Sequence, residues 1–164
     1  MKILVFIEGT VLMHKGTDGI NRKDIVEQSK NREKSVKEYF SYIPIGNCVN
    51  KLKMWKSQNV QLFYLTSRTK ANEVNDMNNV LKKFDFPKGK LLFRKNKETY
   101  GNVAEKIIPD VLIEDDCESI GGVSEMTFPK IKSNIKKRVK SIIIKEFGGI
   151  DFLPDKVNAL LNYC

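Results

Sequence analysis

Short apolar runs alternate along this chain with longer stretches in which apolar positions recur at helical spacing. The short runs are rich in Val, Ile, Leu and Phe and predict strands buried on both faces, at Ile3–Ile7, Val60–Leu65, Lys90–Phe93, Val111–Ile113 and Ser141–Ile144. The longer stretches predict helices at Val49–Ser57, Ala71–Phe84, Thr99–Ile107 and Asp155–Asn162. This alternation indicates an α/β fold: a Rossmann-like, doubly wound, mainly parallel five-stranded sheet with helices on both faces.

Residues 16–44 are the one stretch without a strand signal. They are polar, begin with Gly16 and Gly19, and have a helical pattern around Ser35–Tyr42. We expect a small helical insertion after the first strand, lying over one edge of the sheet. Residues 1–164 are then predicted to form a single domain, because the insertion is too short to be a second one.

Composition narrows the class of protein. Hydrophobic residues make up 41% of the chain, which is enough for an ordinary globular core. No run of 18 apolar residues and no secretory signal pattern occurs, so we expect no membrane partner and a cytoplasmic location. Cys48, Cys117 and Cys164 are widely spaced without a CxxC pair, which makes a disulfide framework or a structural zinc site improbable.

The charge balance favours anionic partners. There are 29 basic and 20 acidic residues, a net charge of +9. Phosphorylated metabolites, nucleic acid and acidic surfaces all fit this charge, so it does not choose among them.

Polar side chains follow three of the predicted strands. The first strand is followed by Glu8-Gly9-Thr10, the second by Thr66-Ser67-Arg68, and the fourth by Glu114-Asp115-Asp116. Ligands of open parallel sheets bind beyond the carboxyl ends of the strands. Hydroxyl groups beside a turn suit phosphate oxygens, and paired carboxylates suit Mg²⁺. These strand ends therefore predict a site for phosphate and a divalent cation.

Taken in order, the same segments resemble the motifs of the haloacid dehalogenase-like (HAD-like) superfamily of phosphatases and phosphoryl-transfer enzymes. Segment Ile3–Thr10 looks like the family's first strand and its DxDGT motif, Leu65–Ser67 like its phosphoryl-binding second motif, and Val111–Asp116 like its acidic fourth motif. The resemblance covers roughly Lys2–Lys145. It implies that Thr66 and Ser67 bind phosphate, that Asp115 and Asp116 bind Mg²⁺, and that Glu8 is the general acid and base. A different doubly wound domain is the alternative.

One departure from the family pattern decides what activity to expect. The family's aspartate nucleophile lies three residues before the glycine, and here that residue is Phe6. A phenyl ring can neither attack phosphorus nor ligate Mg²⁺. Glu8 keeps a carboxylate with one extra methylene group. The chain is therefore predicted to be a degenerate or non-standard phosphohydrolase without an aspartyl-phosphate intermediate; any hydrolysis would use water oriented by Glu8.

The third family motif is a lysine that neutralises the phosphoryl group. Lys97 is our choice, because it lies between the third strand and the helix that starts near Thr99. Each cation in this region also fits a solvated surface residue. The other candidates are Lys90, Arg94, Lys95 and Lys106.

Structural roles compete with the chemical ones at several positions. Thr66 and Ser67 also fit the caps of the following helix. His14, the only histidine, is either structural or solvated, or it is a proton donor or substitute nucleophile. Cys117 follows three carboxylates that should raise the pKa of its thiol, so we interpret it as a small core residue, and Trp55 likewise belongs to the core.

The run Lys130–Lys140 contains six cations but no interleaved aromatic residues. We interpret it as a solvated helix face that attracts nucleic acid only non-specifically.

Three functions remain open from the sequence. The first is an enzyme-like domain that processes or binds a phosphorylated small molecule with Mg²⁺. The second is a non-catalytic protein that binds a ligand or partner on the same fold, and the third is a basic nucleic-acid-associated protein. The identity of the substrate, any turnover and the oligomeric state are left open.

Overall fold

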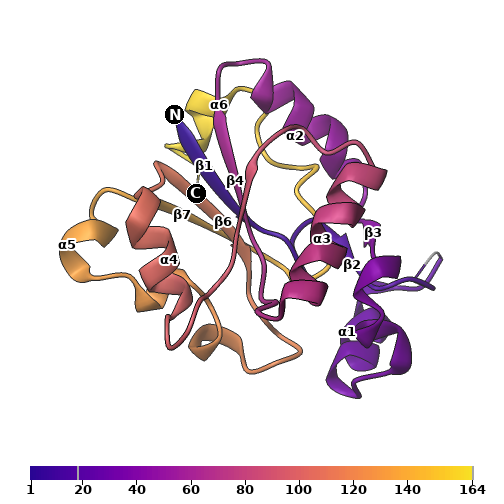
Figure 1. Cartoon of the computed structure of the whole chain (residues 1–164). Helices are drawn as coiled ribbons and strands as arrows, with labels where there is room; N and C mark the ends of the chain where they lie inside the picture. Colours follow the sequence, from indigo (N-terminus) through magenta and orange to yellow (C-terminus); the bar gives the residue numbers. More distant parts are fainter. Residues whose placement is uncertain (18, 164) are drawn as a thin grey trace.

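The central feature of the computed structural model, which describes residues 1–17 and 19–163, is a five-stranded sheet (Figure 1). The strand order is β5-β4-β1-β6-β7, and every neighbouring pair is parallel. The strands are β1 (Lys2–Phe6), β4 (Gln61–Leu65), β5 (Lys90–Leu92), β6 (Val111–Asp115) and β7 (Lys140–Ile144). This confirms the predicted Rossmann-like α/β fold.

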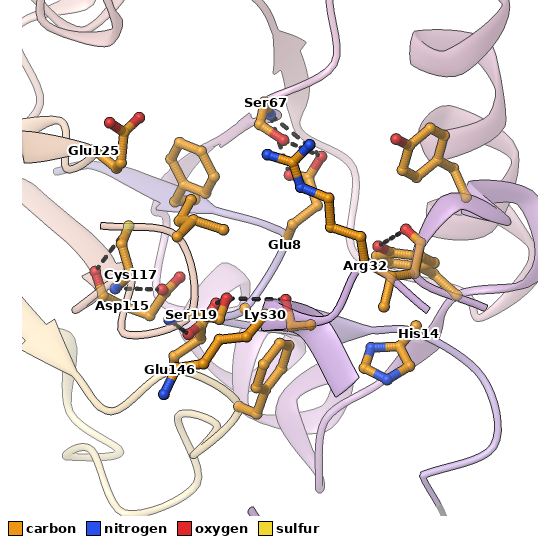
Figure 2. Close-up of a pocket in the computed structure, with 18 of the residues that line it drawn as sticks. Glu8, His14, Lys30, Arg32, Ser67, Asp115, Cys117, Ser119, Glu125 and Glu146 are labelled. Atoms are coloured by element: carbon orange, nitrogen blue, oxygen red, sulfur yellow. Dashed lines mark hydrogen bonds between the residues drawn. The ribbon is translucent and has the colours of Figure 1, made fainter. Parts of the chain in front are cut away.

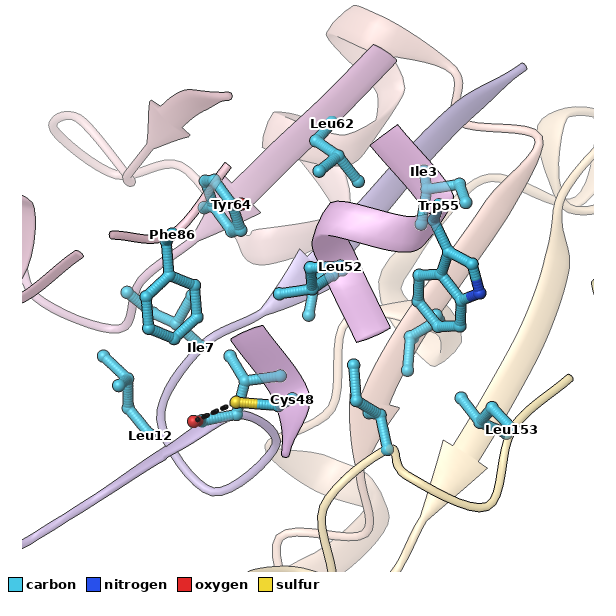
Figure 3. Packing of buried hydrophobic residues seen from close by; sticks show 14 of the residues in the cluster. Ile3, Ile7, Leu12, Cys48, Leu52, Trp55, Leu62, Tyr64, Phe86 and Leu153 are labelled. Atoms are coloured by element: carbon cyan, nitrogen blue, oxygen red, sulfur yellow. Dashed lines mark hydrogen bonds between the residues drawn. The ribbon is translucent and has the colours of Figure 1, made fainter. Parts of the chain in front are cut away.

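Both faces of the sheet are covered because the strand residues alternate between two cores. In β1, Ile3 and Val5 belong to one apolar cluster, whereas Leu4 and Phe6 belong to another. The first cluster includes the buried sides of α2 (Cys48–Lys56), α3 (Ala71–Lys83) and α6 (Val157–Leu160). Figure 3 shows Cys48, Leu52 and Trp55 of α2 in this cluster. The second includes α4 (Tyr100–Ile107), with α5 (Ser133–Lys136) packed against it through Ile135.

Hydrogen bonds to side chains explain where two of these helices begin, one of them local in sequence and the other long-range. Thr99 and Asn102 form a reciprocal capping box at the start of α4, at 3.0 and 3.1 Å. Helix α6 is shorter than the predicted Asp155–Asn162: it begins at Val157, whose N–H donates to the side chain of Gln58 at 3.1 Å.

The insertion between β1 and α2 lies at the carboxyl end of the sheet, and we call residues 16–44 the cap. Strands β2 (Leu12–Met13) and β3 (Ile43–Pro44) pair antiparallel and bring the two ends of the insertion together. Neither strand was predicted, because a strand of two residues is too short to show a hydrophobic period. Helix α1 (Arg22–Lys30) is the main element of the cap, and Asn21 accepts a hydrogen bond from the Asp24 N–H at its start.

The helical pattern predicted around Ser35–Tyr42 takes a tighter form than an α-helix. That stretch contains two short 3₁₀ helices, Lys34–Lys37 and Tyr39–Ser41, which are closed by bonds to the third preceding carbonyl. The Tyr42 hydroxyl donates to the Val36 carbonyl at 2.7 Å, which holds the stretch in this compact form.

Only part of the basic run Lys130–Lys140 is helical, so the helix face predicted over the whole run is too long. Helix α5 covers four of its residues, and Lys140 already belongs to β7. Ile131 and Val139 are buried at 3% and 7% exposure and fix the run to the second core cluster.

No helix within residues 1–17 and 19–163 is long and apolar enough to cross a membrane.

Candidate functional site

A cavity of about 500 Å³ lies between the carboxyl ends of the strands and the cap (Figure 2). We call it the cap cavity. Its floor includes Phe6, Glu8, Ser67, Arg68 and Asp115, and its roof includes the cap residues Lys30, Arg32, Val36, Lys37, Tyr39 and Tyr42.

Glu8 is the most heavily bonded side chain on the floor. The Thr66 hydroxyl donates to its Oε1 at 2.6 Å, and the Ser67 hydroxyl donates to the same oxygen at 3.1 Å. The Ser67 backbone N–H lies 3.2 Å from both carboxylate oxygens. The structure thus brings together three site residues that the sequence predicted, because the expected phosphate ligands Thr66 and Ser67 both donate hydrogen bonds to Glu8.

Arg68 adds a cation to this group. Its Nε lies 3.5 Å from Glu8 Oε1 and 3.1 Å from the Ser67 hydroxyl. The guanidinium stacks on the ring of Tyr39, 4.3 Å from its centroid, and donates to the Tyr39 hydroxyl. Arg68 therefore connects the floor of the cavity to the cap. The sequence displayed this residue at a strand end, but only the fold shows that it points at Glu8.

Phe6 ends β1 beside these polar groups. It is 8% exposed and packs edge-on against Tyr100, with ring centroids 5.2 Å apart. Both rings line the cap cavity. Where the family pattern has a carboxylate, this chain therefore presents an aromatic surface.

Asp115 lies next to the turn that follows β1. The Thr10 hydroxyl and the Cys117 N–H each donate to its carboxylate at 2.9 Å. A Cβ on Gly9 would lie 2.7 Å from Asp115 Oδ2, and the φ of Gly9 is +82°, so this turn requires glycine. Burial raises the pKa of Asp115 to about 6, although both hydrogen bonds oppose the shift.

The other two carboxylates of the acidic motif have structural partners. Glu114 is 2% exposed and accepts hydrogen bonds from the Thr127 and Phe128 N–H groups at 2.6 and 2.9 Å. Asp116 pairs with Lys145 at 2.9 Å. Although burial acts to raise it, the pKa of Asp116 is held below its usual range by Lys145 and the Glu146 N–H.

Glu146 is a buried carboxylate of the cavity that the sequence reasoning missed. It accepts hydrogen bonds from the Ser119 N–H and hydroxyl at 2.6 and 2.7 Å. Burial raises the pKa of Glu146 to about 7, against those hydrogen bonds. The Ser119 hydroxyl also lies 2.9 Å from that of Ser29, so this group joins the cap to the loop after β6. Glu146 can be recognised as a cavity residue only from the topology, which places the ends of β6 and β7 side by side.

The donors around Asp115 do not fit a magnesium site built from several carboxylates. Phe6 offers no oxygen ligand, and the carboxylate of Asp116 is neutralised by Lys145. Within the described residues, no group of three or more His, Cys, Asp or Glu side chains is arranged to hold a metal ion.

The structure does not bring Lys97 to this cavity. Lys97 is exposed in the loop between β5 and α4, and it is not among the residues that line the cap cavity. The cations that do line it are Lys30, Arg32 and Lys37 of the cap, together with Arg68. Figure 2 shows the Arg32 side chain extending from the cap into the cavity.

His14 and the described cysteines have structural surroundings. His14 is 1% exposed, bonds through Nε2 to Gln28 at 2.8 Å, and packs edge-on against Phe147. Burial, with a further contribution from Asp115 and Glu114, raises the pKa of the Cys117 thiol and keeps it protonated. Cys48 is likewise free and buried, whereas Cys164 lies outside the described residues.

Solved structures with a similar fold include phosphatases. A class C acid phosphatase from Bacillus anthracis gives a TM-score of 0.57 at 14% identity, over 98% of this chain and 75% of that one. A HAD hydrolase of family IA, variant 3, from Entamoeba histolytica gives a TM-score of 0.50 at 12% identity, over 99% of this chain and 88% of that one.

A chain of the Pnkp1/Rnl/Hen1 complex gives a TM-score of 0.53 at 14% identity over 88% of this chain, which spans only 46% of that chain. No protein-family model and no curated protein match the sequence. At these identities the likeness shows the fold alone, a Rossmann-like α/β domain.

The two raised carboxyl pKa values predict a pH dependence of stability. Asp115 and Glu146 bind their protons more tightly in the folded chain than in the unfolded chain, where carboxyl pKa values are about 4. Their contribution to the free energy of unfolding is therefore expected to fall as the pH rises from about 4 to about 7. Urea unfolding across this range should show a shallower decline for Asp115→Asn and for Glu146→Gln than for wild type. Identical slopes in all three proteins would contradict the burial of these charges.

Proposed function

We propose that this chain binds a phosphorylated small molecule in the cap cavity and does not hydrolyse it through an aspartyl-phosphate. The observation that carries the proposal is Phe6, an apolar ring at the end of β1, beside a set of oxyanion donors from Thr66, Ser67 and Arg68. The donors for an anion are retained, whereas the nucleophile is absent.

The charges of the cavity support a ligand with one anionic end. Three cap cations and Arg68 line the space, and within the described residues Arg32 and Lys37 form no ion pair, whereas Lys30 pairs with Glu27 and Arg68 with Glu8. The floor adds the aromatic rings of Phe6 and Tyr100. An organic phosphate, with its charge on the cations and its apolar part on the rings, matches both surfaces.

This function is tested with p-nitrophenyl phosphate, whose binding and cleavage are read separately by calorimetry and by absorbance. We expect saturable binding to wild type with negligible release of nitrophenolate. Arg32→Ala and Lys37→Ala should each weaken binding several-fold, because a charge-assisted hydrogen bond to phosphate is lost. The matched control is Lys23→Ala, which removes the same charge from an exposed cap position outside the cavity lining.

Lys97→Ala is measured in the same series because it separates two assignments of the phosphate-binding cation. Weaker binding in this variant would support the sequence-based choice of Lys97, whereas unchanged binding would support the cavity cations. Absence of binding to wild type would refute the proposed function.

The second candidate function is binding of the end of a nucleic acid, and two cations beside the cavity favour it. The Arg94 guanidinium and the Lys130 ammonium lie 4.1 and 5.3 Å from the ring centroid of Tyr100, which lines the cap cavity. One of the similar folds occurs in a structure described as the Pnkp1/Rnl/Hen1 RNA repair complex.

Any such binding is expected to be non-specific, because the basic run provides charge without base-stacking residues. The logarithm of the association constant for single-stranded RNA should fall by about 0.7 for each phosphate contacted per tenfold rise in salt. Fluorescence anisotropy with RNAs of different sequence at several salt concentrations measures this slope. A sequence-preferring complex that resists salt would contradict the interpretation.

A further inference from the structure

The anion donors at the end of β4 are engaged by a side chain of the protein itself. Glu8 takes the hydroxyls of Thr66 and Ser67 and the Ser67 N–H, all within 3.2 Å. Hydroxyl, backbone N–H and guanidinium groups converging on one carboxylate form a site for an oxyanion. The carboxylate of Glu8 therefore lies where these donors would hold a ligand's anionic group.

The geometry depends on the length of the glutamate side chain and on the cap. Glu8 follows β1 directly, and its carboxylate reaches the loop after the neighbouring strand β4, to which β1 is paired from Lys2↔Gln61 to Phe6↔Leu65. Arg68 completes the donor set, and Tyr39 of the cap fixes the guanidinium by stacking and by accepting its hydrogen bond. The donors are thus held in place from two sides.

We propose that Glu8 is a built-in competitor for the anion site formed by Thr66, Ser67 and Arg68, so that an oxyanion binds there only when the Glu8 carboxylate moves away. This inference rests on the proposed function, since it concerns the same cavity. It assigns Arg68 as an anion ligand, and it makes Glu8 a regulator of binding in place of the general acid and base that the family resemblance implies.

A competitor of this kind lowers the apparent affinity by a simple relation. When only a fraction of the molecules have a free site, the apparent dissociation constant is the intrinsic one divided by that fraction. An incoming oxyanion must replace the hydrogen bonds of Glu8 and also meets the charge of its carboxylate. Removing the carboxylate should therefore tighten binding even though it removes a polar group from the cavity.

The test is calorimetric titration of the full chain with tungstate, a tetrahedral oxyanion. Glu8→Ala is expected to bind tungstate on the order of tenfold more tightly than wild type. Glu8→Gln should lie between them, because its amide oxygen still accepts from the donors while its charge is gone. In the Glu8→Ala background, Ser67→Ala should return the affinity toward the wild-type value by removing one donor.

The matched control is Glu125→Ala. Glu125 lines the same cavity, and within the described residues its side chain bonds only to the neighbouring Ser124, at 3.4 Å, so its removal changes the charge of the cavity without freeing the anion site. A tightening in this control equal to that of Glu8→Ala would overturn the proposal and assign the effect to net charge alone.

The remaining outcomes separate this inference from the proposed function. If wild type binds p-nitrophenyl phosphate but Glu8→Ala binds tungstate no more tightly than wild type does, competition by Glu8 is refuted and the proposed function stands. If no variant binds either probe, both are refuted.

Discussion

The Phe6→Asp protein is expected to be less stable than wild type by more than about 3–5 kcal/mol, the usual loss on deleting a buried phenyl ring. Phe6 is 8% exposed, belongs to the second core cluster and packs edge-on against Tyr100. The substitution removes these contacts and places a carboxylate in the cavity that Asp115 also lines, and the pKa of Asp115 is already raised by burial to about 6. Urea unfolding measures the loss.

Phe6→Ala is the control, because it removes the same ring without adding a charge. The difference in the free energy of unfolding between the two variants is the loss of stability caused by the introduced carboxylate. Mg²⁺ should reduce that difference, since a bound cation stabilises only the folded state that holds it. We expect calorimetry to show tighter Mg²⁺ binding in Phe6→Asp than in wild type, where the predicted ligands Asp115 and Asp116 lack a third carboxylate. Equal binding by both proteins would show that a carboxylate at position 6 does not complete a magnesium site with Asp115 and Asp116.

The second large effect is a gain of phosphatase activity. With Mg²⁺ present, Phe6→Asp is expected to cleave p-nitrophenyl phosphate on the order of a hundredfold faster than wild type, because positioning and charge stabilisation supply most of the catalysis in phosphoryl transfer. The double variant Phe6→Asp/Glu8→Asp should be faster still, since the shorter side chain reaches the donors of Thr66 and Ser67 less well. Brisk activity in wild type that is abolished by Glu8→Gln would instead indicate direct attack by water.

Most of the fold was predictable because it depends on local patterns. Buried parallel strands produce continuous apolar runs, and Ile3, Val5 and Ile113 face one core while Leu4 and Leu112 face the other. The cap was predicted as a small helical insertion, but the position of its main helix was not. Its helix α1 is mostly polar, with Ile25 and Val26 as its buried residues, so the helical period is weak there.

The residues on the floor of the cap cavity were predictable from the sequence, but the side chains that contact them were not. Asp115 ends β6, whereas Glu8 and Ser67 lie two residues beyond the ends of the neighbouring strands β1 and β4, and all three line one cavity. The roles of Arg68, Lys145 and Glu146 depend on which side chains meet across neighbouring strand ends and the cap, and no spacing in the sequence encodes those contacts. Lys97 shows the converse: its position along the chain suits the family pattern, but its loop leaves it exposed.

The absence of an aspartyl-phosphate is tested most directly by the intact mass of the protein after incubation with acetyl phosphate and Mg²⁺ and an acid quench. The account predicts an unmodified wild-type chain and a phosphorylated fraction in Phe6→Asp, because only the variant has a carboxylate at the end of β1. A phosphorylated wild-type chain, with the group on Glu8 or Asp115, would contradict it.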